Sequence, residues 1–562
     1  MARNKTRQQA GETRGRGERA DGAGAREFDA LVVGGGHNGL CLAAYLARAG
    51  WSVAVAERRH EEGGGLNTEE PCIPGFYHNM HAQFMEFLDY MPLYRDFDLE
   101  RMGARWVYPE AQCGIAFADG RAPVIIHRPD LLDRTHASIA RYSKADADTF
   151  CELKRRTMEI DQLLAAAVYT PPPLVPEGEM PNPLDNPLYD PIFSHLRLDK
   201  ACVMKSPKVI IDELFETPEL RALLYRECVE WGTPIDMEMG GIAFVMSVLW
   251  LSSIWKLIVG GTHTLAHAMT QACLREGVTF LESSDVSQIL LSGRRAVGIR
   301  TADGREFGAR HVVASSADIQ QTLLGMVGEE NLSELWRRRA RAFRYGPSHV
   351  LATTVWCLRE APHYRSAEVD PEIDRCFYVM VGFDGPEDTI DYIRAAYSGH
   401  LPQHAAGVWV NTLHDPSQGP VGMHSATGWF FFPSADRLSE EEWVEVRRTY
   451  NARFLETWQR FAPNMTAENV LAERLYTPDQ MDSKNKMRFG DFSNGAFAHD
   501  QLNSSRPFPE AAQYRTEIDG LYLCGASSHP GGGVHAACGY NAYKAIASDH
   551  GLPAPLQEGR IY

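Results

Sequence analysis

The sequence predicts an α/β protein, and three stretches of the chain support this fold class. Residues 28–57 contain a short apolar strand, a glycine-rich turn, an apolar helix and a second strand. Residues 260–314 again alternate helix and strand, and include an Asp-Gly pair typical of a hairpin. A strand, a glycine-rich loop and a helix beginning at Val534 follow from residue 521. We therefore expect one α/β domain assembled from N-terminal, middle and C-terminal segments.

The composition is that of a large globular protein. Its 562 residues are 44% hydrophobic and 23% charged, a balance that excludes global disorder and fibrous classes. The length suggests about two to four domains. The formal net charge of −17 argues against nucleic acid as the main partner and against strong electrostatic docking on anionic lipid.

The cysteines and the N-terminus bear on the cellular compartment. The 11 cysteines are scattered without a CxxC pair, which argues against a disulfide framework or a zinc cluster and favours a reducing, cytoplasmic location. The first 27 residues lack the apolar core of a secretory signal and mix glycine with charges. This segment is therefore predicted to be a disordered tail.

Two segments of the middle region allow alternative interpretations. The apolar run 242–255 is too short for a bilayer span of roughly 20 residues, so we expect a buried helix. Its alternative is a substrate tunnel or a peripheral membrane contact, which would make the protein membrane-associated. The proline-rich stretch 170–191 excludes helix and central strand, and is expected to be a surface loop or, alternatively, a lid over a site.

The first glycine-rich turn has the pattern Gly34-x-Gly36-x-x-Gly39 between a strand and a helix. Such glycines permit a tight turn, close approach of a pyrophosphate and close packing of helix on strand. Glu57, at the end of the second strand, is suited to accept hydrogen bonds from ribose hydroxyls. Its charge argues against a ribose 2′-phosphate, because two anions repel.

Two further glycine-rich loops favour FAD over NAD. Residues 63–65 follow Glu57 at the spacing at which two-dinucleotide-binding flavoproteins place a glycine pair. The loop 525–533 offers bare backbone to a flat ring, and the helix after it can offset negative charge on a reduced flavin. A nicotinamide-only dehydrogenase does not need this last loop.

The chain resembles the phytoene desaturase family of FAD-dependent oxidoreductases, and within it the bacterial β-carotene ketolase type. The matching stretches are VVGGGHNGLCLAAYLARAGWSVAVAERR, GGGLNTEE followed by Pro74-Gly75-Phe76, VGGTHTL and GLYLCGASSHPGGGVHAACGYNAYKA. They extend over most of the chain from Phe28 to about Ser548. The resemblance implies a Rossmann-like two-dinucleotide-binding flavoprotein with a discontinuous FAD domain and a mixed α+β substrate domain.

The resemblance also implies which residues contact FAD. The first glycine turn would line the diphosphate, and Glu57 with its neighbour Arg58 would contact the adenosine. The second glycine loop would contact the ribitol, Val286 would contact the adenine, and the last loop would contact the flavin. The implied cofactor-binding residues are Gly34, Gly36, His37, Asn38, Gly39, Glu57, Arg58, Gly64, Gly65, Thr68, Val286, Gly525, Ala526, Gly533 and Val534.

The chain departs from related enzymes in three places. Amine oxidases usually carry Arg at the position of Gly65 and an acid at that of Ala526, so both residues argue against an amine oxidase. The stretch 538–541 (CGYN) replaces the usual Gly-Arg-Asn-Ala surroundings and argues against an ordinary carotenoid substrate.

Histidines are the candidate catalytic residues. His529 is expected near the flavin, where it positions substrate or relays a proton, and His535 is the second candidate. The alternative for His529 is a loop histidine bonded to backbone. His78 and His81 are expected at a substrate entrance, and no metal site is expected because a third ligand is missing.

The expected organisation places FAD-domain and substrate-domain segments alternately along the chain. The expected boundaries are 1–27 tail, 28–125 FAD domain, 126–259 substrate domain, 260–318 FAD domain, 319–509 substrate domain, 510–550 FAD domain and 551–562 C-terminal tail. Aromatic side chains are expected to line an apolar pocket or to pack in the core: Trp231, Trp250, Trp255, Trp356, Phe430, Phe431 and Phe432.

The expected reaction is dehydrogenation or another oxidation of a C–H bond in a largely apolar small molecule, such as a carotenoid or isoprenoid. Electrons would pass through FAD to oxygen, a quinone or another acceptor. One alternative is a flavin amine or alcohol oxidase on the same scaffold. The other is a flavin-binding interaction protein without turnover.

Overall fold

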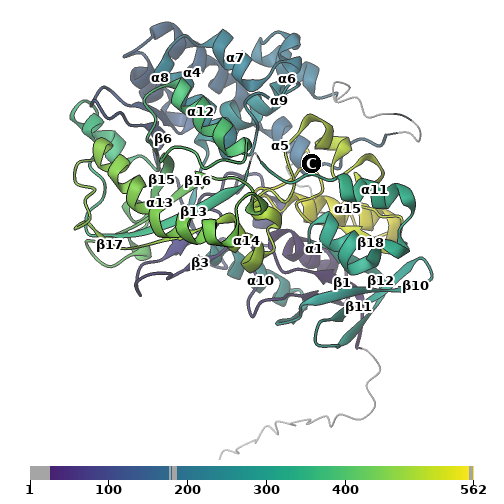
Figure 1. Ribbon diagram of the computed structural model, residues 1–562. Helices are drawn as coiled ribbons and strands as arrows, with labels where there is room; N and C mark the ends of the chain where they lie inside the picture. The colour runs from purple at the N-terminus through teal and green to yellow at the C-terminus, as the bar shows by residue number, and fades with distance from the viewer. Residues whose placement is uncertain (1–25, 176–178, 180–186, 348, 556–560) are drawn as a thin grey trace, which may run out of the picture.

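The computed structural model describes residues 26–175, 179, 187–347, 349–555 and 561–562. Among these residues, two seven-stranded β-sheets and the helices packed around them make up most of the molecule (Figure 1). Most of the expected N-terminal tail and residues 176–178 and 180–186 of the proline-rich stretch lie outside the described residues. Arg26 and Glu27 begin the first strand, so order starts slightly earlier than predicted.

The first sheet unites the three predicted segments. Its order is β10-β11-β12-β1-β2-β9, and β18 pairs with β12. The pairs β12–β1, β1–β2, β2–β9 and β12–β18 are parallel, so their carboxyl ends meet at one edge. The strands are β1 (Arg26–Val33), β2 (Val53–Ala56), β9 (Thr279–Leu281), β10 (Val286–Ser292), β11 (Arg295–Thr301), β12 (Glu306–Ser315) and β18 (Leu521–Leu523).

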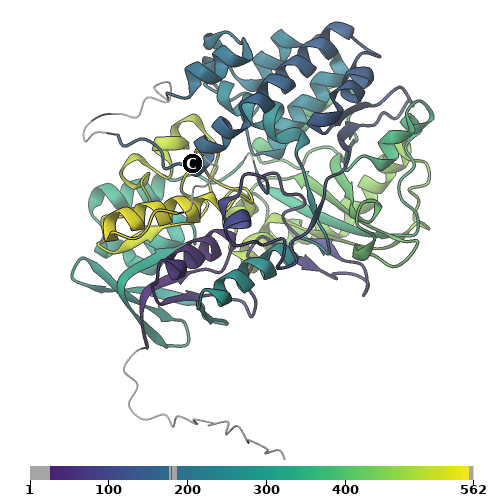
Figure 2. The same ribbon diagram turned by 180° about the vertical axis from the view of Figure 1, so that it is seen from behind.

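Three helices cover one face of this sheet. They are α1 (His37–Arg48), α10 (His263–Arg275) and α15 (Ala537–His550), and Figure 2 shows α1 and α15 side by side. Helix α1 is buried from Asn38 to Ala47, and Gly50 follows it with φ +95°, a conformation that suits glycine at a helix end. The predicted last helix begins at Ala537 rather than at Val534, because the glycine-rich loop extends to Ala536 in a left-handed conformation.

The second sheet forms the core of the remaining region. Its order is β17-β13-β16-β15-β14-β6-β7, with bounds β6 (Ala111–Ile115), β7 (Val124–His127), β13 (Leu351–Leu358), β14 (Tyr378–Val381), β15 (Ala406–Val410), β16 (His424–Phe431) and β17 (Val470–Tyr476). Strands β6 and β7 thus belong here, although the expected boundary at 125 placed most of them in the FAD domain. Four short strands make two separate pairs: β3 (Thr68–Glu69) with β4 (His78–Asn79), and β5 (Trp106–Val107) with β8 (Leu257–Ile258).

Helix α13 (Glu440–Phe461) packs across the second sheet, and several aromatic residues of the sheet are buried beneath it. It begins with a capping box between Ser439 and Glu442. Its buried aromatic side chains share one core cluster with Trp356, Phe430 and Phe432. These three residues therefore pack in the core and do not line an apolar pocket.

A helical region covers the other end of the molecule. It contains α3 (Leu132–Ile139), α4 (Lys144–Glu159), α5 (Asp161–Tyr169), α6 (Tyr189–Leu196), α7 (Pro207–Leu214), α8 (Pro218–Glu230) and α9 (Gly241–Phe244). The remaining helices are α2 (Pro92–Asp96), α11 (Glu334–Ala342), α12 (Pro386–Tyr397) and α14 (Pro478–Asn485). Pro191 lies in the first turn of α6, so helix begins inside the stretch predicted to be loop; the first helical turn tolerates proline.

The apolar run 242–255 is an irregular, mostly buried helical segment. After α9 it continues as a π-helical stretch at residues 245–250 and a 3₁₀ turn at 251–253. Among the described residues no helix is long and apolar enough to cross a membrane. The side chain of Tyr562, in the expected C-terminal tail, is buried: its ring stacks on Tyr169 at 5.1 Å and its hydroxyl donates to the Tyr90 carbonyl at 2.9 Å.

Candidate functional site

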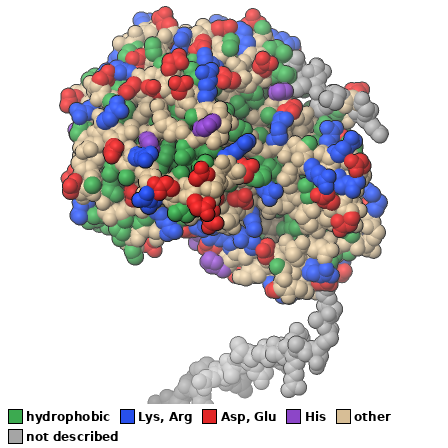
Figure 3. All heavy atoms as spheres, viewed as in Figure 1, with side chains coloured by type: hydrophobic (Ala, Val, Ile, Leu, Met, Phe, Trp, Pro, Cys, Tyr) green, Lys and Arg blue, Asp and Glu red, His purple; other side chains and the backbone are tan. Residues whose placement is uncertain are grey.

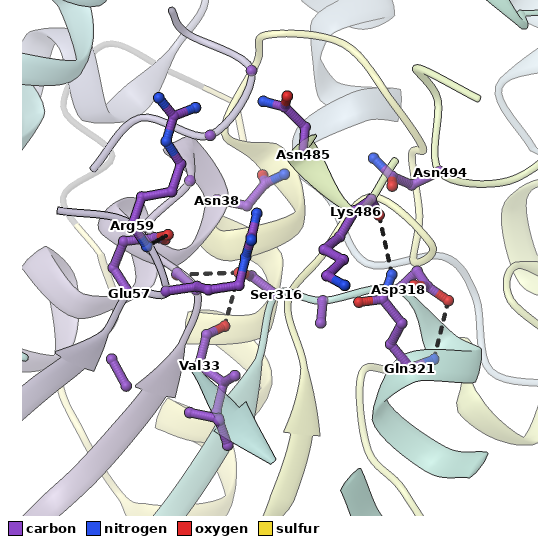
Figure 4. Close-up of a pocket in the computed structure, with 18 of the residues that line it drawn as sticks. Val33, Asn38, Glu57, Arg59, Ser316, Asp318, Gln321, Asn485, Lys486 and Asn494 are labelled. Atoms are coloured by element: carbon purple, nitrogen blue, oxygen red, sulfur yellow. Dashed lines mark hydrogen bonds between the residues drawn. The ribbon is translucent and has the colours of Figure 1, made fainter. Parts of the chain in front are cut away.

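A cavity of about 280 Å³ opens at the carboxyl edge of the first sheet, which we call the nucleotide cavity (Figure 4). In open parallel sheets ligands bind at this edge. Its walls come from all parts of the chain: Val33, Gly34, Gly36, His37, Asn38, Ala56, Glu57, Arg58, Arg59, Gly64, Gly65, Ser284, Asp285, Val286, Ser316, Ala317, Asp318, Gln321, Met326, Asn485, Lys486, Met487, Asn494 and Ala526.

The first glycine turn forms one wall of the nucleotide cavity. Gly34 has φ +91°, and a Cβ on Gly39 would lie 2.1 Å from the Gly34 carbonyl oxygen, so neither position admits a side chain without movement. A Cβ on Gly36 would meet nothing within 4 Å, which marks open space above the turn. Gly36 caps α1 without a side-chain acceptor. Bare N–H groups at a helix start favour an anion such as a diphosphate.

Glu57 is held at the end of β2 by backbone donors. Its Oε2 accepts from Gly35 N at 2.8 Å, and its Oε1 accepts from Arg59 N at 2.8 Å. The carboxylate therefore has a fixed position at the cavity wall and retains lone pairs for further donors. This is the position predicted for the residue that binds ribose.

The opposite wall contains residues that the sequence pattern did not single out. Ser316 Oγ donates to the carbonyls of Val33 and Gly34, at 2.9 and 3.1 Å, and so ties β12 to the glycine turn. Gln321 Nε2 donates to Lys486 O at 3.0 Å and joins the helical segment 321–328 to the end of α14 (Figure 4). Burial raises the pKa of Asp318, which faces the same space.

Five of the predicted cofactor contacts do not line the nucleotide cavity, and one of them is Gly39, whose place is set by its packing against the Gly34 carbonyl. The hydroxyl of Thr68 donates to Asn79 Oδ1 at 2.8 Å and accepts from His263 N at 3.1 Å, so it joins β3 to β4 and to the start of α10 instead. A Cβ on Gly525 would lie 2.3 Å from Ser316 O, which gives this glycine a packing role. Gly533 and Val534 lie farther along the last loop, outside the set of lining residues.

The first and last glycine-rich loops meet directly. A Cβ on Gly539 would lie 2.0 Å from Asn38 O, which places α15 against the start of α1. The rings of His37 and His535 are 6.4 Å apart, edge to face. The convergence expected from the sequence is therefore present in the fold.

A second cavity, of about 210 Å³, is lined in part by the last loop, and we call it the apolar cavity. Ala526 lines the nucleotide cavity, whereas His529, Pro530, Gly532 and His535 line the apolar one. Its other walls are Glu86, Phe87, Leu164, Ala167, Val168, Leu188, Tyr189, Ile192, Trp231, Thr233, Ile242, Ala243, Met246, Ser247, Leu251, Phe497, Leu502 and Asn503. Trp231 is thus the one residue of the aromatic set predicted from the sequence that lines it.

The two candidate catalytic histidines both face the apolar cavity. Burial lowers the pKa of His529 to about 4 and that of His535 to about 3, so both rings are neutral near pH 7. His529 Nε2 lies 3.0 Å from the Ala167 carbonyl, which makes it a donor and leaves Nδ1 without a partner among the described residues. The backbone contact expected as its alternative role therefore exists alongside a free ring nitrogen.

His78 and His81 do not form the expected substrate entrance. Both are buried, at 0% and 2% exposure, and neither lines either cavity. The ring of His81 packs edge-on against Phe492 at 5.5 Å. Within the described ranges no three His, Cys, Asp or Glu side chains gather to hold a metal ion.

The nucleotide cavity fits FAD on structural grounds. A side-chain-free cradle at a helix start suits a diphosphate, and a fixed carboxylate at a strand end suits ribose hydroxyls. Gly64 and Gly65 also line this cavity, and the last loop contributes residues to both cavities. The residues present can hold the nucleotide at one end and bring its ring to that loop.

Comparisons with known proteins agree with this architecture. The model of the NAD(P)-binding Rossmann-like domain family matches residues 32–98. A subunit of the limonene dehydrogenase of Castellaniella defragrans is 31% identical over 544 residues, covering 94% of this chain and 96% of that protein. The 4,4'-diaponeurosporene oxygenase of Staphylococcus aureus is 21% identical, covering 90% and 94%. A putrescine oxidase variant redesigned for cofactor binding superimposes with a TM-score of 0.57 at 16% identity, covering 93% and 98%, and so shares the fold.

Proposed function

Because this chain belongs to the phytoene desaturase-like family of FAD-dependent oxidoreductases, we propose that it dehydrogenates an apolar, isoprenoid-type hydrocarbon in the apolar cavity. The observation that carries this proposal is the position of that cavity. It shares the last glycine-rich loop with the FAD site, and most of its wall is aliphatic or aromatic. Such a wall binds hydrocarbon by burying its surface and offers few partners for charge.

The size of the apolar cavity favours a small substrate. An engineered protein cavity of about 150 Å³ holds benzene, so about 210 Å³ suits a hydrocarbon of roughly ten carbons. A forty-carbon carotenoid would have to extend well beyond it. The relative with 31% identity is named for limonene, a hydrocarbon of this smaller class. We therefore favour a monoterpene-sized substrate over a full-length carotenoid.

The residues of the chain would divide the work between the two cavities. Gly34, Gly36 and Glu57 would hold the nucleotide, Gly39 would let the turn pack closely, and FAD when bound supplies the acceptor for two electrons and a hydrogen. Side chains of the apolar cavity would exclude water and hold the substrate beside the last loop. The start of α15 provides N–H groups that favour negative charge near that loop.

The final electron acceptor and the cellular site complete the proposal. We propose oxygen or a quinone as acceptor and the cytoplasm as the compartment, since all eleven cysteines are unpaired thiols. Acidic and basic side chains are interspersed over the face shown in Figure 3. A peripheral contact with membrane remains part of the proposal only as a route by which an apolar substrate reaches the protein.

Anaerobic bleaching of the bound flavin tests the proposed reaction. The purified FAD-loaded protein is mixed with limonene, a C30 and a C40 carotenoid, putrescine and a primary alcohol, and flavin absorbance is followed. We expect the small hydrocarbon to bleach the flavin fastest. Bleaching by putrescine or the alcohol alone would replace the proposal with an amine or alcohol oxidase. If no donor bleaches the flavin and a partner protein co-purifies, the interaction-protein alternative replaces it.

A further inference from the structure

Glu86 is a buried acid in the wall of the apolar cavity. It lies between β4 and α2 and is 2% exposed. It is the one carboxyl side chain among the described residues that line this cavity. The next residue, Phe87, packs its ring edge-on against His535 at 5.4 Å, which fixes this segment against the last glycine-rich loop. The acid therefore has a defined place beside the loop that contributes residues to both cavities.

Glu86 and His535 border the same bare backbone position. A Cβ on Gly533 would lie 3.7 Å from Glu86 Oε1 and 3.4 Å from His535 Nε2. Because Gly533 has no side chain, nothing from this residue stands between the two groups. Gly533 is also the position that the family resemblance assigns to the flavin contact.

The hydrogen bond on the far side of His535 sets its tautomer. Nδ1 accepts from Ala537 N at 3.0 Å, so the ring proton resides on Nε2. Nε2 makes no full hydrogen bond with any described residue, and the backbone of Gly531 and Gly532 beside the ring opposes the fall of its pKa only in part. The Tyr169 hydroxyl donates to the His535 carbonyl at 3.0 Å and holds the backbone. His535 thus offers one N–H donor on the side where Glu86 lies.

The surroundings make Glu86 a base of useful strength. Burial raises its pKa to about 8, and Lys256, whose ammonium pairs with Asp89, opposes that rise weakly. The other titratable groups near it are Tyr169, His529 and His535, and burial raises the pKa of the first and lowers those of the two histidines. A base titrating near the working pH is well matched to proton removal.

We propose that Glu86 is the catalytic base of the dehydrogenation and that His535 is the residue that positions it; this rests on the proposed function. The Glu86 carboxylate removes a proton from one substrate carbon and forms a carboxyl O–H bond. The neighbouring carbon loses hydrogen with its electron pair to bound FAD, the oxidant, and a C=C bond forms. The substrate is oxidised by two electrons, and the proton on Glu86 later returns to solvent. When Glu86 is charged, the Nε2–H of His535, which has no hydrogen-bond partner among the described residues in the resting arrangement, donates to the carboxylate and stabilises that form.

Two readouts test the proposal, one of which does not depend on turnover. Infrared titration of the resting protein from pH 6 to 10 should show a protonated carboxyl band that disappears with a midpoint near 8 and is absent in E86Q. Anaerobic flavin reduction by limonene should rise over the same pH range in the wild type and fall about a hundredfold or more in E86Q. Retained FAD absorbance shows that the variant is folded.

Variants at two other positions separate positioning from structure. H535A should shift the infrared midpoint and the rate profile upward by about one pH unit, and H535Q, which retains an N–H donor, should restore them toward the wild type. Glu227 provides a matched control, because it is fully buried with its pKa also raised to about 8 but lies outside both cavities. E227Q should leave the pH profile of flavin reduction unchanged.

The outcomes distinguish this proposal from the one on which it rests. If the wild type is active and E86Q reduces its flavin within twofold of the wild-type rate, Glu86 is not the base and the proposed function stands. An infrared band unaltered by E86Q would also overturn the assignment. If no hydrocarbon bleaches the wild-type flavin, the proposed function is wrong and the assignment falls with it.

Discussion

Replacing Glu57 by glutamine tests how the chain holds its cofactor. The two carboxylate oxygens accept from Gly35 N and Arg59 N, each at 2.8 Å, and are proposed to accept from the ribose hydroxyls as well. Glutamine keeps one acceptor oxygen, loses the charge and turns an NH₂ group toward a backbone donor. Hydrogen bonds to a charged acceptor contribute about 1.5–3 kcal/mol each and neutral ones about 1. We therefore expect E57Q to weaken FAD binding by about 2–3 kcal/mol.

This loss corresponds to an increase of about 30- to 150-fold in the FAD dissociation constant. The assay is titration of FAD into deflavinated protein, followed by quenching of flavin fluorescence and by calorimetry. E62Q is the matched control, because Glu62 lies close to Gly35 but does not line the nucleotide cavity. Binding by E62Q should stay within twofold of the wild type. If E57Q also binds FAD within threefold of the wild type, the assigned role of Glu57 is wrong.

Three further outcomes are expected. G39A should lose FAD and stability together, because its Cβ would lie 2.1 Å from Gly34 O; an FAD-replete G39A with an unchanged melting temperature would contradict the described packing. H529A should retain flavin but reduce it more slowly, since it loses the contact with Ala167 O and a ring facing the cavity; an unchanged rate would leave His529 a structural role only. Thermal stability should fall as the pH drops from 6.5 toward 4, because buried histidines stay neutral in the folded state whereas the unfolded chain binds protons near pH 6.5. Burial lowers the pKa to about 4 in four of them: His37, His81, His349 and His529. Each contributes about 1.4 kcal/mol per pH unit of this window, and a melting temperature that stays constant from pH 7 to 5 would refute the reasoning.

Local pattern was enough for the central strands of the first sheet and for the cofactor turn, but not for the strands of the second sheet. The apolar runs 28–33 and 52–56 and the final strand at 521–524 occur within about two residues of their predicted places, because fully buried parallel strands are uninterrupted apolar runs. The position of the residues after the strand 311–314 is a further signal for the ligand site. Side chains that follow a parallel strand lie at the ligand edge of the sheet, and Ser316 and Asp318 do so.

The far wall of the FAD site and the buried acid could not be predicted in the same way. Asn485 and Lys486 reach the cavity because α14 ends there in a left-handed residue, and no periodic pattern brings that helix end to the first sheet. Glu86 left one local trace, an acid between Met85 and Phe87. Only the folded arrangement shows that this acid faces a cavity and a histidine 449 positions farther along the sequence. Glutamate usually lies at the protein surface, and tertiary contacts decide where one is buried.

The parallel pairing of β12 with β1 on one side and β18 on the other has a consequence for biosynthesis. The ribosome completes β18 (Leu521–Leu523) long after β1 (Arg26–Val33), at about 5–20 residues per second. Until then the apolar face of α1 lacks α15, and the nascent polypeptide exposes surface that chaperones recognise. We therefore expect flavin to bind only after β18 and α15 have been made, and recombinant yield to depend on chaperone supply and on the free FAD present at that stage.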